Sequence, residues 1–281
     1  MIRSNLFQIA YWATSVFFAI GAAPFLLIPS RKPLMVWIFG YTRVMVFWLR
    51  WIVGVRIVIR GRERLPHGPC VIAAKHQSWG DGVVMFSQFF DLAFVTGDHL
   101  EKFPLLGRIL RKMGAIVVDN CGGAYARACL ISREMKRARS ENRRILIYPE
   151  GRLSPVGEKH HYRKGVYHMY AAYDCPAVPV ATNLGLCWPP VGEGRQQENA
   201  PAPRRAEHAF ARLRAREQSW RLTPGEAVVE FLDPIAPGLD KETFMKWLEE
   251  AIETRSRELA GLAPAQPADG PLIAQAKTER A

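Results

Sequence analysis

The chain has 281 residues, enough for one large core or two small ones, so its length favours one or two domains. Its formal net charge is +12, which predicts attraction to polyanions such as nucleic acid, anionic lipid headgroups or an acidic protein. The five cysteines are odd in number and lack the paired spacing of metal ligands, which indicates reduced thiols in a cytosolic environment. We also find no phosphate-binding glycine loop, so neither a metal site nor a bound cofactor is expected.

An apolar N-terminus narrows the choice of polyanion. Residues 4–30 contain no charged side chain and are rich in Phe and other apolar residues. A helix of that length can cross a bilayer, and the stretch is too long for a signal peptide. Residues 34–53 are apolar and aromatic as well, but Arg43 and Arg50 share one helical face, which suits the headgroup interface.

We therefore expect residues 1–54 to form a helical hairpin that anchors the protein at an anionic membrane surface. Prolines at 29 and 33 would turn the chain and bring Arg31 and Lys32 to cytoplasmic headgroups, which predicts a location at the cytoplasmic face of the inner membrane. Whether the first helix spans the bilayer or lies in its interface stays open. The alternative is that both segments are buried helices of a soluble domain. A nucleic-acid partner is not expected, because only the net charge favours one.

After residue 54 the pattern changes to short β-branched runs that alternate with helical stretches. Strands are predicted at 56–60, 70–74, 93–96, 115–119, 145–148, 177–181 and 227–232, and helices at about 79–90, 105–113, 123–139, 163–173 and 240–259. This alternation predicts an α/β fold, with a mostly parallel central sheet of about seven strands flanked by helices.

The domain organisation follows from the same pattern. We expect one α/β domain over residues 55–262, interrupted by an arginine-rich insert at about 188–221 that is rich in Pro, Gly and Glu at its start. The insert is either a solvated helix face or a membrane-surface contact. The tail at 263–281, with its Pro and Ala residues, is predicted to be flexible.

One His and one Asp near the end of a predicted strand suggest a catalytic base. His76 follows the strand at 70–74, and Asp81 stands five residues later. A carboxylate on one ring nitrogen fixes the tautomer and stabilises the imidazolium when the other nitrogen takes a proton. Five residues of continuous helix would put the side chains about 140° apart, so pairing requires His76 on a loop and Asp81 in the first turn of the next helix. The alternative is a surface His beside a helix-capping Asp.

Two further features bear on this base. Glu150 follows the strand at 145–148, and the carboxyl ends of parallel strands meet at the same edge of a sheet, where functional groups collect. Ser78 invites a serine-esterase interpretation, but it lacks the glycines of a nucleophile elbow and fits a helix N-cap better.

Several of these residues belong to motifs that resemble those of a known family. The chain resembles the 1-acylglycerol-3-phosphate acyltransferases, the lysophosphatidate acyltransferases of phospholipid synthesis, over roughly residues 55–185 and more weakly from 225 onward. Four blocks carry the likeness, in the family's order: His76 to Asp81 with the flanking Lys75, then 102–107 with 114–119, then Tyr148-Pro149-Glu150-Gly151-Arg152-Leu153-Ser154, then Val178-Pro179-Val180.

The chain departs from the family pattern in two places. Asn120 stands where the family commonly has an Arg, and Leu153 takes an Arg position while Arg152 stands one place earlier. Contacts to a substrate phosphate are therefore less certain, and Arg152, Arg163 or Lys164 would have to supply the charge.

The resemblance implies a membrane-bound enzyme that transfers a fatty acyl group from acyl-ACP or acyl-CoA to the sn-2 hydroxyl of 1-acylglycerol-3-phosphate and gives phosphatidate. His76 would be the general base and Asp81 would orient it. The implied substrate-binding residues are Lys102, Glu150, Gly151, Arg152, Ser154 and Lys164. Glu150 could instead be a structural carboxylate paired with an arginine, and Lys102 a solvated charge.

Two other classes remain open. A related acyltransferase could act on another lysolipid, such as a lyso-ornithine lipid or a lysocardiolipin, and the departures at Asn120 and Leu153 favour that alternative. A non-catalytic, membrane-bound lipid-binding protein is the other, and the presence of both His76 and Asp81 argues against it.

Overall fold

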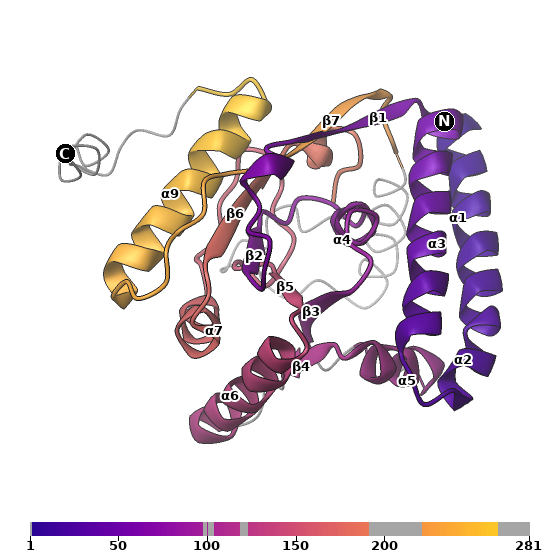
Figure 1. The fold of residues 1–281 in the computed structure, drawn as a ribbon. Coiled ribbons are helices and arrows are strands. Elements are labelled where there is room, and N and C mark those ends of the chain that lie inside the picture. The colour runs from indigo at the N-terminus through magenta and orange to yellow at the C-terminus, as the bar shows by residue number, and fades with distance from the viewer. Residues whose placement is uncertain (1, 98–99, 101–103, 119–122, 191–220, 264–281) are drawn as a thin grey trace, which may run out of the picture.

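A seven-stranded sheet forms the centre of the protein (Figure 1). The structure, a computed structural model, describes residues 2–97, 100, 104–118, 123–190 and 221–263. The strands are β1 (Val55–Arg60), β2 (Val71–Ala74), β3 (Leu92–Gly97), β4 (Ile116–Val118), β5 (Arg144–Ile147), β6 (Ala177–Thr182) and β7 (Gly225–Phe231), in the order β1-β7-β6-β2-β5-β3-β4. Each predicted strand is present within two residues of its expected ends.

The sheet is mostly parallel, as predicted. Strands β6, β2, β5, β3 and β4 run in one direction, while β7 pairs antiparallel with β6, and β1 pairs parallel with β7. The carboxyl ends of β2 and β5 are neighbours, because Ala73 pairs with Ile147. The loops that carry His76 and Glu150 therefore leave the sheet side by side.

Helices cover both faces of the sheet and make three layers. They are α4 (Asp81–Phe86), α5 (Pro104–Met113), α6 (Ala124–Ser140), α7 (Gly165–Tyr173) and α9 (Lys241–Leu259). Because side chains alternate along a strand, Ile72 and Ala74 join the apolar cluster under α4, while Val71 and Ala73 join the cluster under α6, α7 and α9. This alternation continues into the loop after β2 and decides which face each of its side chains enters.

The segment before α4 differs from the prediction. The helix extends over Asp81–Phe86, shorter than the predicted 79–90, and its N-cap residue is Gly80. The prediction of Ser78 as the N-cap is wrong, since its hydroxyl accepts a hydrogen bond from the Gly80 N–H at 3.0 Å, within the turn that precedes the helix. The Asp81 carboxylate binds the backbone there instead, which leaves residues 75–80 as a loop.

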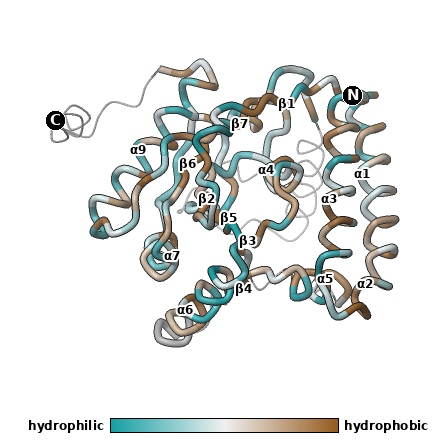
Figure 2. Tube along the Cα trace, in the orientation of Figure 1, coloured by the Kyte–Doolittle hydropathy of each residue, from teal (hydrophilic) through white to brown (hydrophobic). Residues whose placement is uncertain are grey.

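The N-terminal helices form a separate pair beside the sheet. Helix α1 (Ile2–Gly21) is followed by α2 (Ala23–Leu27), and α3 (Lys32–Trp48) returns next to α1 and ends in a π-helical turn (Leu49–Val53) (Figure 1). Both segments, Ile2–Leu27 and Lys32–Val53, are long and apolar enough to cross a membrane. Figure 2 shows many brown, hydrophobic residues along α1 and α3.

These helices leave large apolar side chains in contact with solvent. The exposed ones are Ile2, Leu6, Ile9, Trp12, Val16, Phe17, Ile20, Leu27, Ile28, Val36, Phe47 and Trp51. On α1 only Ser4 and Phe7 are buried, so the alternative that both segments are buried helices of a soluble domain is wrong. Exposed aromatic and aliphatic side chains on this scale favour membrane association.

Both ends of the hairpin are fixed to the α/β layers. Near the start of α1, the Ser4 hydroxyl donates to the Leu222 carbonyl at 3.3 Å and accepts from the Leu222 N–H at 3.2 Å. At the turn, Arg31 pairs with Asp91 at 3.0 Å and with Glu141 at 2.7 Å. Arg31, which we expected at lipid headgroups, therefore binds two carboxylates of the protein itself.

Candidate active site

His76 and Asp81 are in contact, as the sequence predicts. His76 lies on the loop that leaves β2, and its Nδ1 is 3.0 Å from Asp81 Oδ2 in the first turn of α4. The His76 side chain is 23% exposed and that of Asp81 is 4% exposed, so the ring reaches solvent while the carboxylate lies beneath it. Because Nδ1 is engaged, Nε2 is the nitrogen left to exchange a proton with a substrate.

The Asp81 carboxylate also shapes the loop. Its Oδ2 accepts hydrogen bonds from the backbone N–H groups of Gln77 and Ser78, both at 2.7 Å. One oxygen thus binds the His76 ring and two amides that follow it. These amides hold the carboxylate in place, so the position of the ring depends on the backbone conformation of residues 77–80.

An aromatic ring covers one face of the imidazole. Tyr148, directly after β5, stacks on His76 with ring centroids 4.0 Å apart and an interplanar angle of 18°. Its hydroxyl is buried and has no hydrogen-bond partner among the described residues, and burial, followed by the charge of Asp81, raises the pKa of this phenol well above its usual value. Stacking restricts rotation of the imidazole, and an aromatic face favours an imidazolium.

Glu150 lies beneath the loop, away from solvent. The residue is 2% exposed, its Oε1 is 3.1 Å from the ammonium of Lys75, and its Oε2 accepts from the His160 N–H at 3.0 Å. The alternative interpretation of Glu150 expected an arginine partner, and that detail is wrong, because the partner is Lys75, the residue before His76. Its role in substrate binding stays a prediction.

The loop after Glu150 supports His76 from the other side. Ser154 is fully buried, its N–H donates to the His76 carbonyl at 2.7 Å, and its hydroxyl donates to the Glu158 carbonyl at 2.9 Å. Gly151 adopts a φ of +64°, and its N–H donates to the Tyr148 carbonyl at 2.9 Å. Both residues therefore bind the protein itself, and their predicted contact with substrate is not tested by these bonds.

Three basic residues lie on the exposed rim of this loop. Arg152 is exposed and lies 2.8 Å from His160 Nδ1, and Arg163 packs over Gly151, where an added Cβ would lie 2.6 Å from its Nε. Lys164 is exposed and is the residue before the first turn of α7. Of the other predicted site residues, Lys102 lies outside the described residues, as does Asn120.

Comparison with known proteins shows what the chain is similar to. Residues 56–183 match the family model described as Acyltransferase. Residues 56–183 form an acyltransferase domain. The chain is 28% identical over 217 residues to the 1-acyl-sn-glycerol-3-phosphate acyltransferase of Pseudomonas aeruginosa, which covers 74% of this chain and 82% of that protein. It is 27% identical over 139 residues to a chloroplastic protein of the same description from Brassica napus, covering 48% of this chain and 40% of that one.

A solved structure shows the same fold. The crystal structure of the 1-acyl-sn-glycerophosphate (LPA) acyltransferase from Thermotoga maritima matches with a TM-score of 0.67 and 19% identity, covering 94% of this chain and 99% of that one. The resemblance that the four sequence blocks indicate is thereby confirmed. The chain is an enzyme similar to the acyltransferases, and its α/β fold with N-terminal apolar helices is shared with this structure.

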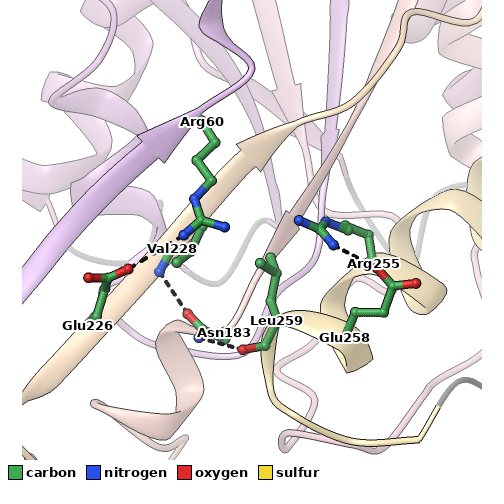
Figure 3. Close-up of a pocket in the computed structure, with 7 residues that line it drawn as sticks. All are labelled: Arg60, Asn183, Glu226, Val228, Arg255, Glu258 and Leu259. Carbon is green, nitrogen blue, oxygen red and sulfur yellow. Dashed lines mark hydrogen bonds and ion pairs between the residues drawn. The ribbon is translucent and has the colours of Figure 1, made fainter.

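One cavity of the protein, shown in Figure 3, does not include His76 in its lining. It has a volume of about 310 Å³ and is lined by Arg60, Asn183, Glu226, Val228, Arg255, Glu258 and Leu259. Its charges neutralise one another, since Arg60 lies 3.6 Å from Glu226 and Arg255 lies 2.7 Å from Glu258. The cavity holds no unpaired charge for an anionic substrate.

Metal and thiol chemistry find no support among the described residues. No group of three or more His, Cys, Asp or Glu side chains there could hold a metal ion. Cys70, Cys175 and Cys187 are buried free thiols, and burial raises the pKa of each, to about 11 for Cys70. Buried thiols of raised pKa are poor nucleophiles, and the exposed thiol, Cys129, lies on α6, outside the loop that carries His76.

Two members of the site were not singled out from the sequence. Tyr148 was noted only as part of a family block, although its position after a parallel strand, next to the strand that leads to His76, was a usable signal. The contact of Glu253 with Lys75 could not be predicted from local sequence patterns, because the two residues are 178 positions apart.

Proposed function

We propose that this enzyme transfers a fatty acyl group from acyl-ACP or acyl-CoA to the sn-2 hydroxyl of 1-acylglycerol-3-phosphate and forms phosphatidate. The observation that carries the proposal is the pair His76 and Asp81, held 3.0 Å apart at the carboxyl end of β2 with the ring open to solvent. The named relatives, described as 1-acyl-sn-glycerol-3-phosphate acyltransferases, support the choice of acceptor.

The chemistry follows from the two ring nitrogens. His76 Nε2 removes the proton from the acceptor hydroxyl as its oxygen attacks the thioester carbonyl carbon, while Asp81 stabilises the positive charge through Nδ1. The tetrahedral intermediate collapses, the C–S bond breaks, and the imidazolium returns its proton to the leaving thiolate. General-base assistance of this kind contributes a factor of about 10²–10⁴ in rate. No enzyme nucleophile and no bound cofactor are needed.

The acceptor phosphate is assigned to the basic rim. Arg152, Arg163 and Lys164 are exposed beside the loop that supports His76, and a guanidinium offers two parallel donors to a phosphate. This assignment replaces the arginine that the family places where this chain has Leu153. The same departure favours a second candidate acceptor, another lysolipid with a different headgroup.

The N-terminal hairpin supports a reaction at a membrane. Both acceptor and product are lipids, and α1 and α3 expose the apolar side chains that would enter the acyl layer. We assign the enzyme to the cytoplasmic face of the inner membrane, where an anionic lipid surface attracts its net charge of +12 and where the acidic thioester donors are found.

An assay with purified protein in detergent tests the proposal. Lysophosphatidate and a radiolabelled acyl thioester, either ACP or CoA, are supplied to the wild type and to His76→Ala. We expect labelled phosphatidate from the wild type and a loss of at least about 100-fold for His76→Ala. His168→Ala, an exposed histidine on α7, is the matched control and should retain activity.

Each outcome of the assay decides one alternative. No phosphatidate from the wild type, together with product from another lysolipid, would replace the acceptor. If no lysolipid gives a product, the remaining alternative is a non-catalytic, membrane-bound lipid-binding protein. Full activity of His76→Ala would remove the proposed base.

A further inference from the structure

We infer that Glu253 on α9 is a positioning residue for the catalytic base, and that it acts through Lys75, the neighbour of His76 in the chain. The inference rests on the proposed function, because it takes His76 as the base. It assigns a role in the reaction to the last helix, which lies 178 positions after Lys75 in the chain.

Lys75 is a buried ammonium whose hydrogens all have acceptors. The side chain is 1% exposed, and its Nζ lies 2.7 Å and 3.0 Å from the two carboxylate oxygens of Glu253. The Glu158 carbonyl accepts at 3.1 Å, and Glu150 Oε1 lies at 3.1 Å on the remaining side. An ammonium in this position is stable only because carboxylates surround it.

Glu253 is held as tightly as Lys75. Its Oε1 accepts from the Lys75 ammonium and also from the Tyr162 hydroxyl at 2.8 Å. Burial raises the pKa of Glu253, and the Lys75 charge opposes that shift. Donors therefore lie on both carboxylate oxygens of Glu253.

The cluster is mechanically joined to the base. Successive side chains point to opposite faces of an extended segment, so Lys75 enters the α7 and α9 face while His76 lies on the α4 face beside Tyr148. The Lys75 N–H donates to the Val180 carbonyl at 3.0 Å, and the His76 carbonyl accepts from Ser154 at 2.7 Å. The Lys75 side chain therefore gives this short loop a third contact with the rest of the protein, and Glu253 on α9 is the residue that it binds.

Several charged or titratable groups surround His76. Asp81 on α4 and Tyr148 after β5 contact the ring directly. Behind the loop, the groups that act through space are Lys75, Glu150 and His160 from the adjoining loops, Tyr162 before α7, Glu253 on α9, and Lys159, whose ammonium faces α9. Changing the charge of the cluster should therefore shift the pH at which the base loses its proton.

The test measures the pH dependence of kcat/KM for three variants in detergent. Lys75→Met removes a positive charge and should raise the midpoint of the acidic limb by about half a pH unit, whereas Glu253→Gln should lower it by a similar amount. The double variant has the net charge of the wild type, and its midpoint should return towards the original value. We expect kcat to fall severalfold in each single variant, with KM for the acceptor little changed.

Glu249→Gln is the matched control, since it makes the same change on the same helix. Glu249 pairs with the exposed Lys159 at 2.6 Å, so its loss should leave both kcat and the midpoint unaltered. Glu253→Asp keeps the charge and should retain the wild-type midpoint.

The outcomes separate this inference from the proposed function. If His76→Ala is inactive but the two single variants leave the midpoint in place, or move it in the same direction, Glu253 is only structural and the inference is wrong. If His76→Ala is active, the proposed function itself fails. Should Lys75→Met not fold, Glu253→Gln, which keeps the shape of the side chain, decides the result alone.

Discussion

Lys75 and His76 are consecutive residues with opposite surroundings. Lys75 is 1% exposed and lies among carboxylates under α9, whereas the His76 side chain is 23% exposed and stacks on Tyr148 on the other face. The alternation of a β-strand, continued for two residues past Ala74, produces this separation. One short loop can thus carry a reactive group on one side and its support on the other.

This difference indicates which substitutions should mainly lower the free energy of unfolding and which should mainly lower kcat. A buried charge that loses its partners costs several kcal/mol, while a partly exposed imidazole can be removed with little structural effect. The variants below test that division, from the largest expected effect to the smallest.

Lys75→Ala should lower the free energy of unfolding by about 3–5 kcal/mol, because it leaves Glu150 and Glu253 buried without a cation. His76→Ala should lower it by no more than about 1 kcal/mol. Urea unfolding followed by tryptophan fluorescence measures both. Equal losses would show that the two faces of the loop are not independent.

Asp81→Asn should reduce kcat by about 10²–10⁴-fold with little loss of stability. The amide oxygen can still accept from Gln77 and Ser78, but an amide cannot stabilise the imidazolium of His76. Steady-state kinetics and thermal unfolding of the same preparation check the two halves of this prediction. A variant with normal kcat would show that Asp81 acts only as a backbone ligand.

Tyr148→Phe should raise the free energy of unfolding by about 1 kcal/mol, because it removes a buried hydroxyl that has no hydrogen-bond partner. Its kcat should stay within about twofold of the wild type, since the ring still stacks on His76. Tyr148→Ala, which removes the ring, is the contrasting variant and should lose both activity and stability. A large fall in kcat for Tyr148→Phe would assign the hydroxyl a part in the reaction.

Lys159→Ala should change the free energy of unfolding by only about 0.2–1 kcal/mol, because its pair with Glu249 is exposed to water. Glu249 lies on α9, one turn before Glu253, so the two glutamates compare an exposed and a buried ion pair made from the same helix. Added salt should reduce the change in the free energy of unfolding caused by Lys159→Ala, and it should leave the change caused by Lys75→Ala nearly the same.

Local patterns predicted the strands well, because buried parallel strands consist of short runs of Val, Ile and Ala such as those in β2 and β6. The pairing of His76 with Asp81 was predictable too, since five residues on a loop leave few geometries. The reversed direction of β1 and β7 was not, because it depends on connections between distant strands. The contact between Lys75 and Glu253 was hidden for the same reason.

The details of α4 show another limit. An apolar pattern continues through residues 79–90, but the hydrogen bonds from residues 77 and 78 to Asp81 end the loop and start the helix later. Side chains that bind nearby backbone compete with helix formation, and composition alone does not reveal which one succeeds.

Helix α1 contacts the loop that carries His76 through Trp188, and this has a consequence for folding during synthesis. Phe7 packs edge-on against Trp188 at 5.3 Å, and Trp188 lies so close to Gly80 that an added Cβ would be 2.7 Å from its Cε3. Phe7 of α1 therefore gains this contact only when Trp188, 181 positions later, has been made, and Ser4 gains its hydrogen bonds only with Leu222. Because such distant contacts form late, the growing chain cannot complete its reactive loop until most of it has been translated.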